Sequence, residues 1–469
     1  MSNKLLRHIS LIGIGLYLAA LLTVTLVFRA YALQLKWMLW GIGEVLFFFV
    51  LTTVFYPRWK QDEPKKFWHK VFWIALAIRV VYAFVMCYYY YWETGIGFEY
   101  KAGDSIWYHQ EAVHLSRAVH EGYFSYVFKY LNAFTMGWSD QGYLLWLTLV
   151  YSIFGRSWLV PRLFKALMSA YLCIVVWKLG SRTFGERTGR LAAVMCVFLP
   201  VLIQICGLHT KEMEMIFLSI LALERMDHLI RSKKYSVWNI LFPILLTGLA
   251  FGFRTIIGMC LIFAFLVFVV LSSKDLVGKK VKIITVSVIG VVFLVFLFSP
   301  IGSEMKNIYR MKFKDLTYQS EKYDSLGMKH GELAQSWVLA PGAFVLPLSP
   351  LVEEAPDNNK MINGSMYVKN FLAFFAMLAL VIAFRQKKWR DFSLIGAYEL
   401  SYLTLIMFSF AANSERYHEP AIPLLVLMAA YAMTHLRRKD LKIFYVYCGV
   451  LFITLIAWNW LKLSARGLA

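Results

Sequence analysis

The sequence predicts an all-α polytopic membrane protein with about 13 transmembrane helices. Its 469 residues are 59% hydrophobic and only 16% charged, and the mean hydropathy is +0.58. That apolar share is well above the one found in soluble globular domains. The apolar residues gather in runs of about 20, which is the length that crosses a bilayer as a helix. Apolar and polar residues do not alternate within these runs, so a transmembrane β-barrel is excluded.

Thirteen apolar runs are expected to span the membrane, and their order predicts the architecture. They are residues 9–28, 37–56, 71–91, 160–180, 189–206, 213–230, 237–252, 255–272, 282–299, 367–385, 391–411, 418–436 and 442–462.

Six clusters of Lys and Arg predict the orientation of these spans. Thirteen crossings with a cytoplasmic N-terminus place all six clusters on the cytoplasmic side, as the positive-inside rule requires. The protein is therefore expected to cross the inner (plasma) membrane several times, with its N-terminus in the cytoplasm. The clusters are Arg58, Lys60, Lys65, Lys66 and Lys70; Arg182, Arg187 and Arg190; Arg231, Lys233 and Lys234; Lys274, Lys279, Lys280 and Lys282; Arg385, Lys387, Lys388 and Arg390; and Arg437, Arg438, Lys439 and Lys442.

The apolar segment Tyr143–Phe154 is too short to cross the bilayer at about 1.5 Å per residue. A crossing there would also move five of the six basic clusters outward, so we expect a helix that lies at the surface or re-enters. Two long segments, residues 92–159 and 300–366, then face outward. The second holds a basic stretch and a proline-broken apolar stretch that cannot form a regular spanning helix. These are Lys306, Arg310, Lys312 and Lys314, followed by Trp337–Pro350 with Pro341, Pro347 and Pro350.

Charge and cysteine usage exclude several other classes. The formal charge of +21 comes mainly from the loops between spans, which favours anionic lipid headgroups over nucleic acid as the partner. All six cysteines lie inside apolar runs, so they fit neither a disulfide framework nor a zinc site. Residues 1–10 are basic, but the run that follows them has the length of a span, and no cleavable signal is expected.

The polar segment Lys101–Glu111 is the strongest candidate for chemistry. It follows the aromatic run Tyr88–Trp92, which is typical of a helix end at a membrane interface. Gly103 allows the backbone to turn, which would place Asp104 at the N-cap of a helix over residues 105–121. Two interpretations of Asp104 stay open at this point: a helix cap or a catalytic carboxylate.

Other acids of the expected outer face are candidates for binding. Glu212 and Glu214 open a span, where they would orient a substrate, hold a metal or complement the helix dipole. His109, His114 and Glu111 could line a metal, although a spacing of five is poor for one helix face. No cofactor is required by the sequence, and a divalent metal stays an open alternative. The remaining acids are Glu93, Glu99, Glu121, Asp140, Glu415, Glu419 and a group within residues 304–357.

Charged residues inside or near the apolar runs should face protein or a wet cavity, because exposure to lipid is costly. Arg79, Glu44, Lys165 and Glu399 belong to this group. Arg79 and Lys165 are expected to pair with acids or, alternatively, to hold a lipid phosphate. Arg254 and Arg416 lie near the expected outer ends of spans, where a guanidinium suits phosphate oxygens. Arg416 could instead be an interfacial anchor beside Tyr417.

Several short motifs, in this order, resemble the GT-C glycosyltransferases. The resemblance is to the protein O-mannosyltransferase and lipid A aminoarabinose transferase group, glycosyltransferase family 39-like, and covers residues 71–436. The motifs are Asp104-Ser-Ile-Trp-Tyr108 with Ala112 and His120-Glu-Gly-Tyr123; Tyr143-Leu-Leu-Trp-Leu ending at Phe154-Gly155; Arg162–Ser169 ending in Gly180–Gly185; Pro200 followed by Lys211–Glu214; and Glu415–Pro423.

The resemblance implies a sugar transferase that uses a polyprenyl-phosphate-linked donor at the outer, periplasmic face. It implies that Asp104 is the catalytic base and that nearby cations hold the donor phosphate. Tyr108, His109, Asp140, Glu212, Glu214, Arg254, Arg416 and Tyr417 are the expected substrate-binding residues. Relatives often carry an acid-Lys-Pro-Pro stretch before the surface helix. The resemblance implies that Asp140 keeps this acid, whereas Gln141 replaces its cation, which argues against one phosphate contact.

The chain departs from the resemblance at its N-terminus. Residues 1–57 precede the family's usual first helix and are expected to be a two-helix addition that is separable from catalysis. Residues 58–436 would form the catalytic core, and residues 437–469 a C-terminal transmembrane helix.

The acceptor implied is a lipid, glycan or protein. The rival functions are a polysaccharide polymerase or ligase with a lipid-linked oligosaccharide, and a lipid transporter. A transporter would place its ligand site at mid-membrane.

Overall fold

The computed structural model describes residues 3–100, 102–134, 141–233, 236–272, 277–298, 342, 344–353, 361–408 and 415–464. Within these ranges nearly all residues are helical, and the β contact is an isolated bridge between Ala32 and Val352. The predicted all-α class is confirmed. The basic stretch Lys306–Lys314 and the predicted site residue Asp140 lie outside the described residues.

The helices follow the predicted apolar runs in order. They are α1 Asn3–Val27, η1 Arg29–Tyr31, α2 Leu35–Trp59, α3 Pro64–Thr94, α4 Gly103–His120, α5 Phe124–Phe134, α6 Gln141–Phe154, α7 Leu159–Phe184, α8 Glu186–Phe198, α9 Pro200–Gln204, η2 Ile205–Gly207, α10 Glu212–Ser232, α11 Val237–Phe253, α12 Thr255–Leu271, α13 Lys279–Phe298, α16 Asn363–Arg385, α17 Ser393–Phe408, α18 Glu415–His418, η6 Glu419–Ala421, α19 Ile422–His435 and α20 Arg438–Ser464.

Every predicted span overlaps one or more helices, but the count of thirteen crossings is not confirmed. In the described part of the chain, α1, α2, α3, α7, α16 and α20 are long and apolar enough to cross a membrane. The bent pair formed by α8 and Pro200–Gly207 makes a seventh if it counts as one span. The shorter apolar helices include α11, α12 and α17. The short helix predicted at Tyr143–Phe154 is α6, which has 14 residues.

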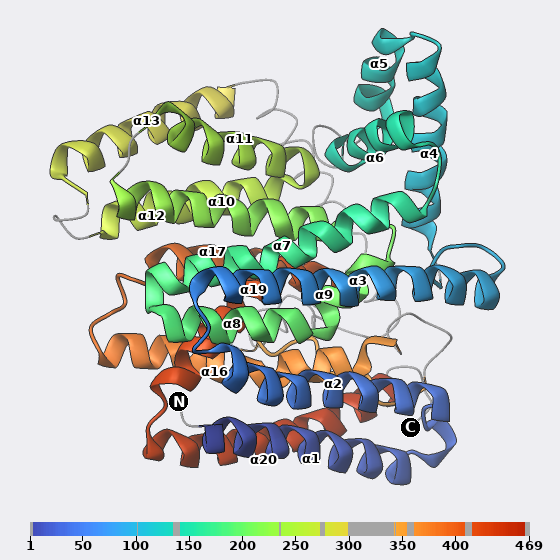
Figure 1. Ribbon diagram of the computed structural model, residues 1–469, viewed down its shortest axis with the longest axis vertical. Helices are drawn as coiled ribbons and strands as arrows, with labels where there is room; N and C mark the ends of the chain where they lie inside the picture. The colour runs from blue at the N-terminus through green and yellow to red at the C-terminus, as the bar shows by residue number, and fades with distance from the viewer. Residues whose placement is uncertain are drawn as a thin grey trace, which may run out of the picture.

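The long helices lie side by side with roughly parallel axes, and α4, α5 and α6 stand together at one end of this bundle (Figure 1). Four ion pairs or hydrogen bonds join the basic loops at the other end. They are Arg190 with the Asp62 carbonyl, Arg182 with Asp227, Arg231 with Asp391, and Arg385 with Asp440. Arg231 also lies over Phe268, near the end of α12. The described residues of the six basic clusters therefore share one end of the bundle, opposite α4–α6.

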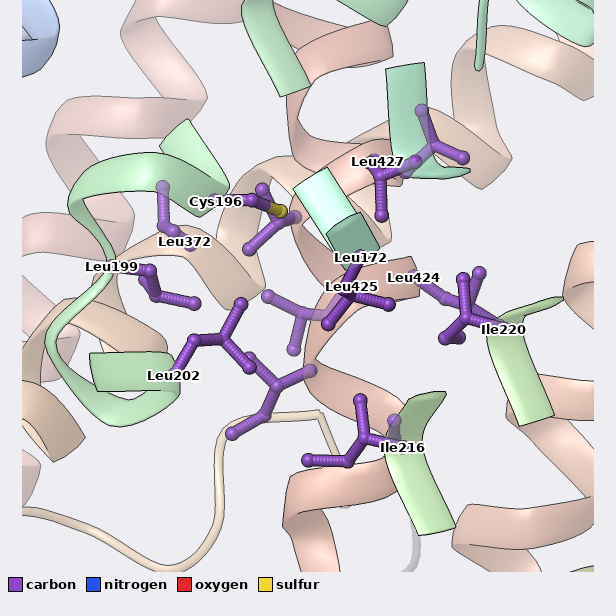
Figure 2. Close-up of a cluster of buried hydrophobic side chains, with 14 of the residues drawn as sticks. Leu172, Cys196, Leu199, Leu202, Ile216, Ile220, Leu372, Leu424, Leu425 and Leu427 are labelled. Atoms are coloured by element: carbon purple, nitrogen blue, oxygen red, sulfur yellow. The ribbon is translucent and has the colours of Figure 1, made fainter. Parts of the chain in front are cut away.

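The core lies where α7, α8, α10, α16 and α19 meet. Figure 2 shows leucine and isoleucine side chains of α7, α10, α16 and α19 pointing toward one another, with Cys196 of α8 and Leu202 of α9 among them. Leu172, Ile216, Leu372, Leu424 and Leu427 are all fully buried, with exposed fractions of 0–1%. In a bilayer such contacts stabilise by close packing rather than by removal of apolar surface from water. This packing holds the helix ends that carry the site.

The span predicted as continuous over residues 189–206 is broken. Its two halves meet at a bend of 54°, and Leu199 at the break is extended. Pro200 explains the break, because it has no N–H to donate to Cys196 and disfavours helical geometry at the preceding residue.

Arg79 satisfies the carbonyls that the break leaves unpaired. It donates to the Cys196 carbonyl over 2.9 Å and to the Val197 carbonyl over 3.2 Å, and it also donates to Ser169. Among the described residues it pairs with no acid, so the expected acid pairing of Arg79 is wrong. Its role is to let α8 bend inside the protein without an orphaned carbonyl.

Residues 344–353 lie beside α16 and α20 without forming a regular helix, as the prolines predict. The Ser349 N–H donates to Asn370 over 3.1 Å, and the Leu351 N–H donates to Asn459 over 2.7 Å. The Glu353 N–H donates to the Tyr31 carbonyl between α1 and α2. The N-terminal hairpin α1–α2 is therefore packed into the same body as the rest of the chain.

Candidate active site

A cavity of about 420 Å³ lies near the end of the bundle where α3 leads into α4. Apolar residues line part of it, among them Tyr82, Tyr90, Val201 and Ile422. The rest of the wall is rich in carboxylates. Its polar lining is formed by Glu99, Asp104, Gln204, Thr210, Glu212, Ser365, Lys369, Glu415, Arg416 and Glu419.

Asp104 is in the first turn of α4 and lines this cavity. The predicted N-cap role is wrong: α4 begins at Gly103, and its N-cap is Ala102, without a side-chain cap. A carboxylate in the first turn is still stabilised by the helix dipole. The Asp104 side chain is 62% exposed, so solvent or substrate can reach it.

Arg416 joins Asp104 to Glu212, residues that are far apart in the sequence. Its Nη1 lies 2.5 Å from Asp104 Oδ2, and its Nε donates to Glu212 Oε1. Glu212 is almost completely buried, whereas Arg416 is partly exposed. Burial alone would lower the pKa of Arg416, but the two carboxylates, Glu212 first, raise that pKa above its ordinary value. The arginine is therefore a permanent cation at the cavity wall.

Lys165 supports the turn that carries Glu212. Its fully buried ammonium lies 3.2 Å from Glu214 Oε2 and donates to the Thr210 carbonyl. The Tyr143 ring covers it at 4.9 Å. The predicted pairing of Lys165 with an acid is confirmed, and Glu214 belongs to this support rather than to the cavity lining.

Two further cations lie around Arg416. Arg254, between α11 and α12, stacks over the Tyr417 ring at 4.4 Å. Lys211 precedes Glu212 and is buried. Burial, and then the positive charge of Arg254, lowers the pKa of Lys211 to about 7. Of the predicted binding residues, Arg254 and Tyr417 thus border the ionic side of the site without lining the cavity.

Tyr108 and His109 belong to α4 but do not line the cavity. The Tyr108 ring packs against Tyr143 at 4.8 Å. His109 Nδ1 lies 2.7 Å from the Tyr151 hydroxyl, which lies 3.1 Å from His209 Nε2. Burial, and then Arg162, lowers the pKa of His109. This network fastens α4 to α6 and to the loop before α10, which positions Asp104.

The residues proposed for a metal are used elsewhere. Tyr130 donates to Glu111, and His114 lies 3.0 Å from the Tyr126 hydroxyl, so both hold α5 against α4. Within the ranges that the structure describes, no group of three or more His, Cys, Asp or Glu side chains is arranged to hold a metal ion.

Of the residues predicted for a site, Asp104, Glu212 and Arg416 line this cavity. Gln204 and Lys369, which also line it, and Lys211 beside it were not among the predicted residues. Gln204 and Lys369 lie inside apolar runs, where a buried polar side chain is costly. A polar or charged side chain inside an apolar run singled out Glu44 and Lys165 in the sequence. The same criterion would have singled out Gln204 and Lys369. Lys211 opens the Lys211–Glu214 motif, but its closeness to Arg254 and Arg416 depends on residues distant in the sequence.

Comparison with known proteins gives one family match. Residues 142–301 match the family model "Dolichyl-phosphate-mannose-protein mannosyltransferase". Glu212 and Arg254 fall within this segment, whereas Asp104 and Arg416 lie outside it. A search of the curated proteins finds no match.

Solved structures with a similar arrangement include oligosaccharyltransferases from Archaeoglobus fulgidus. One, AglB in complex with an inhibitory peptide and a dolichol-phosphate, has 15% identity and a TM-score of 0.46, over 87% of this chain and 56% of that one. Another, tethered with an acceptor peptide, has 16% identity and a TM-score of 0.44, over 85% and 55%. A third, in complex with Zn and sulfate, has 15% identity and a TM-score of 0.43, over 85% and 53%. The chain thus spans little more than half the length of these proteins.

The family match lies inside the part of the chain whose motifs carry the predicted resemblance. It includes α6 except for its first residue, the Phe154-Gly155 pair at which α6 ends, and the segment Lys211–Glu214. The match over residues 142–301 confirms the resemblance of this chain to the dolichyl-phosphate-mannose-protein mannosyltransferases.

Proposed function

We propose that the protein transfers a sugar from a polyprenyl-phosphate-linked donor to an acceptor hydroxyl, with Asp104 as general base. The observation that carries this proposal is the convergence of Asp104, Glu212 and Arg416 on one cavity from three distant segments. A carboxylate and a fixed guanidinium side by side supply a proton acceptor and a phosphate ligand. The matched family is named for a dolichyl-phosphate-mannose donor, which supports this donor class.

The reaction is a single displacement at the anomeric carbon. Asp104 takes the proton of the acceptor hydroxyl while the acceptor oxygen forms a bond to that carbon. The bond between the carbon and the phosphate oxygen breaks, and the lipid phosphate leaves with the electron pair. Attack opposite the departing phosphate inverts the configuration. One carboxylate is sufficient because the donor is already activated, whereas typical glycoside hydrolases use two.

Arg416 has donors left for the phosphate. Asp104 and Glu212 occupy Nη1 and Nε, and a guanidinium carries five N–H donors in all. Arg254 and Lys211 add positive charge next to it. Charge-assisted bonds of this kind stabilise the negative charge that develops on the leaving phosphate.

The proposed active face is the outer, periplasmic one. Asp104 and α4–α6 lie at the end of the bundle opposite the six basic clusters (Figure 1). Basic loops favour the cytoplasmic side, so the cavity belongs to the other side. A lipid-linked donor would reach it from the outer leaflet.

Asp104→Asn is the decisive variant. Asn keeps a carbonyl oxygen but cannot take a proton, so transfer should fall by about 10²–10⁴-fold. Because Asp104 is exposed and is not a cap, the melting temperature should stay near that of the wild type. The assay is transfer of labelled sugar from polyprenyl-phosphate-linked donors, with donor binding measured separately.

Glu111→Gln is the matched control, because Glu111 lies on the same helix and bonds to Tyr130 instead of lining the cavity. It should transfer at close to the wild-type rate. Near wild-type transfer by Asp104→Asn would show that Asp104 is not the base.

A further inference from the structure

The cavity has a second polar region, centred on the amide of Gln204 at the end of α9. Gln204 lines the cavity and is only 6% exposed. Its Nε2 donates to Glu44 Oε1 and, over 2.9 Å, to the Met361 carbonyl. Both partners are acceptors, so the amide nitrogen must face them.

This arrangement fixes the other half of the amide. With Nε2 held by two acceptors, Oε1 must point away from both of them. Gln204 Oε1 is buried and has no hydrogen-bond partner among the described residues. A buried acceptor without a donor is costly, which indicates that a ligand supplies the donor.

Glu44 holds Gln204 in this orientation and comes from the N-terminal hairpin. The Trp40 indole N–H donates to Glu44 Oε1 over 3.2 Å, and the Ser365 N–H donates to Oε2 over 2.9 Å. All the partners of the Glu44 carboxylate are donors, so it acts as an acceptor on both oxygens. A side chain that places an N–H where Glu44 has Oε1 or Oε2, as glutamine would, brings two donors together, and that contact becomes repulsive.

A second acceptor in the same cavity lacks a donor. Glu99 Oε1 accepts from Ser105, whereas Glu99 Oε2 is buried with no partner in the part of the chain that the structure describes. Glu99 lines the cavity together with Asp104 and Gln204. The ligand that fills this space must therefore bring several O–H or N–H groups.

We infer that Gln204 Oε1 accepts a hydrogen bond from a hydroxyl of the transferred sugar, which makes Gln204 a specificity-determining residue that Glu44 orients. This inference rests on the proposed function. A polyprenyl chain has no donor, and a phosphate diester offers only acceptors, which the Gln204 carbonyl would repel. The reacting hydroxyl of the acceptor belongs at Asp104, and within the donor lipid the sugar is the part that carries hydroxyl donors.

The inference assigns a role in substrate recognition to the N-terminal hairpin. Residues 1–57 would then be inseparable from catalysis, contrary to the expectation from their position outside the family resemblance. Removal of α1 and α2 would take away Glu44 and release the Gln204 amide.

The test compares two lipids, a polyprenyl-phosphate-linked sugar and the same polyprenyl phosphate without the sugar. A panel of mannose, glucose, galactose and N-acetylglucosamine forms identifies the sugar that wild-type protein binds. Gln204→Met keeps the volume and removes the acceptor. It should weaken binding of the sugar-bearing lipid by about 10-fold, the value of one hydrogen bond to an otherwise unpaired buried group, and leave binding of the sugar-free lipid unchanged.

Two further variants test the coupling. Glu44→Gln should weaken binding of the sugar-bearing lipid in the same way, and the double variant should be no weaker than Gln204→Met alone, because both act through one amide. Glu93→Gln is the matched control, since Glu93 bonds to Tyr100 outside the cavity lining. It should bind both lipids like the wild type.

Wild-type protein with deoxy-sugar donors gives an independent measurement that needs no substitution. Removal of one particular hydroxyl should lower the affinity for the donor by about 10-fold. Equal affinities for the parent donor and for every deoxy-sugar donor would overturn the inference. Equal binding of the sugar-bearing lipid by Gln204→Met and wild type, or equal losses for both lipids, would also overturn it. Failure of the wild type to bind any sugar of the panel would instead contradict the proposed function, and the inference with it.

Discussion

Arg416 lies between the proposed base and a buried acid, and this position gives it two tasks. It neutralises Glu212, which has little access to water, and it presents its remaining donors to the cavity. Arg254 has a different environment, stacked on Tyr417. The two arginines therefore border the same site but should not be equivalent.

Substitution of each arginine separates these tasks. Arg416→Ala should weaken donor binding by about 1.5–3 kcal/mol, the value of a charge-assisted hydrogen bond. It should also lower the melting temperature, because Glu212 is left buried without its partner. Arg254→Ala should weaken donor binding without the loss of stability. Unchanged donor affinity in both variants would show that other cations hold the phosphate.

We expect Lys211 to make binding of the donor sensitive to pH. Its pKa of about 7 means that it loses its charge as the pH rises through neutrality. The charged form attracts the phosphate, so kcat/KM for the donor, which reports on the free enzyme, should fall above about pH 7. Lys211→Arg should remove this fall, since arginine stays charged. The same alkaline decline in both proteins would exclude Lys211 as its source.

At the scale of elements, the contact between α2 and α16 decides where Glu44 lies. Gly41 permits it, because a Cβ there would overlap Asn363 Oδ1 and the Tyr17 hydroxyl. The Tyr17 hydroxyl itself donates to Asn363 over 2.5 Å, and Asn363 donates to the Trp37 carbonyl. Small residues allow this close approach of helices in membranes.

Two glycines of α2 form a matched pair for this contact. Gly41→Ala should destabilise the protein by about 1–3 kcal/mol through overpacking. Gly43→Ala meets nothing within 4 Å and should be neutral or slightly stabilising, since alanine favours a helix. Thermal unfolding in detergent measures both. Equal melting temperatures for the two variants would show that α2 does not approach α16 this closely.

At the scale of the whole molecule, the charges are divided between the two ends of the bundle. Ion pairs such as Arg182 with Asp227 and Arg385 with Asp440 tie the basic loops together. The carboxylate-rich cavity lies at the other end. This separation is the basis of the proposed orientation.

Cysteine labelling tests that orientation in a background without the six native cysteines. Glu121→Cys, exposed at the end of α4, should react with an impermeant reagent added from outside. Lys439→Cys, exposed in the last basic cluster, should react only after permeabilisation. The opposite pattern would place the cavity on the cytoplasmic side.

Much of this molecule was predictable from local sequence. Helices lie along all thirteen apolar runs, with a break at Pro200 in the run 189–206, because a run of about 20 apolar residues in lipid must satisfy its own backbone. Asp104, Glu212 and Arg416 stood out because charged residues are scarce in such a chain and cluster where chemistry is possible. The broken helix at Pro200 was also within reach, since proline removes a donor whatever its surroundings.

The tertiary structure decided which of these groups meet. Arg416 contacts an acid 312 positions away and another 204 positions away, and no local pattern encodes such distances. Arg79 was expected to meet an acid and instead meets carbonyls freed by a bend in another helix. Sequence by itself determined the helices and the scarce charged residues, because these depend on neighbours along the chain. Only the packing of the helices determined the partner of each charge, because partners depend on which helix ends are brought together in space.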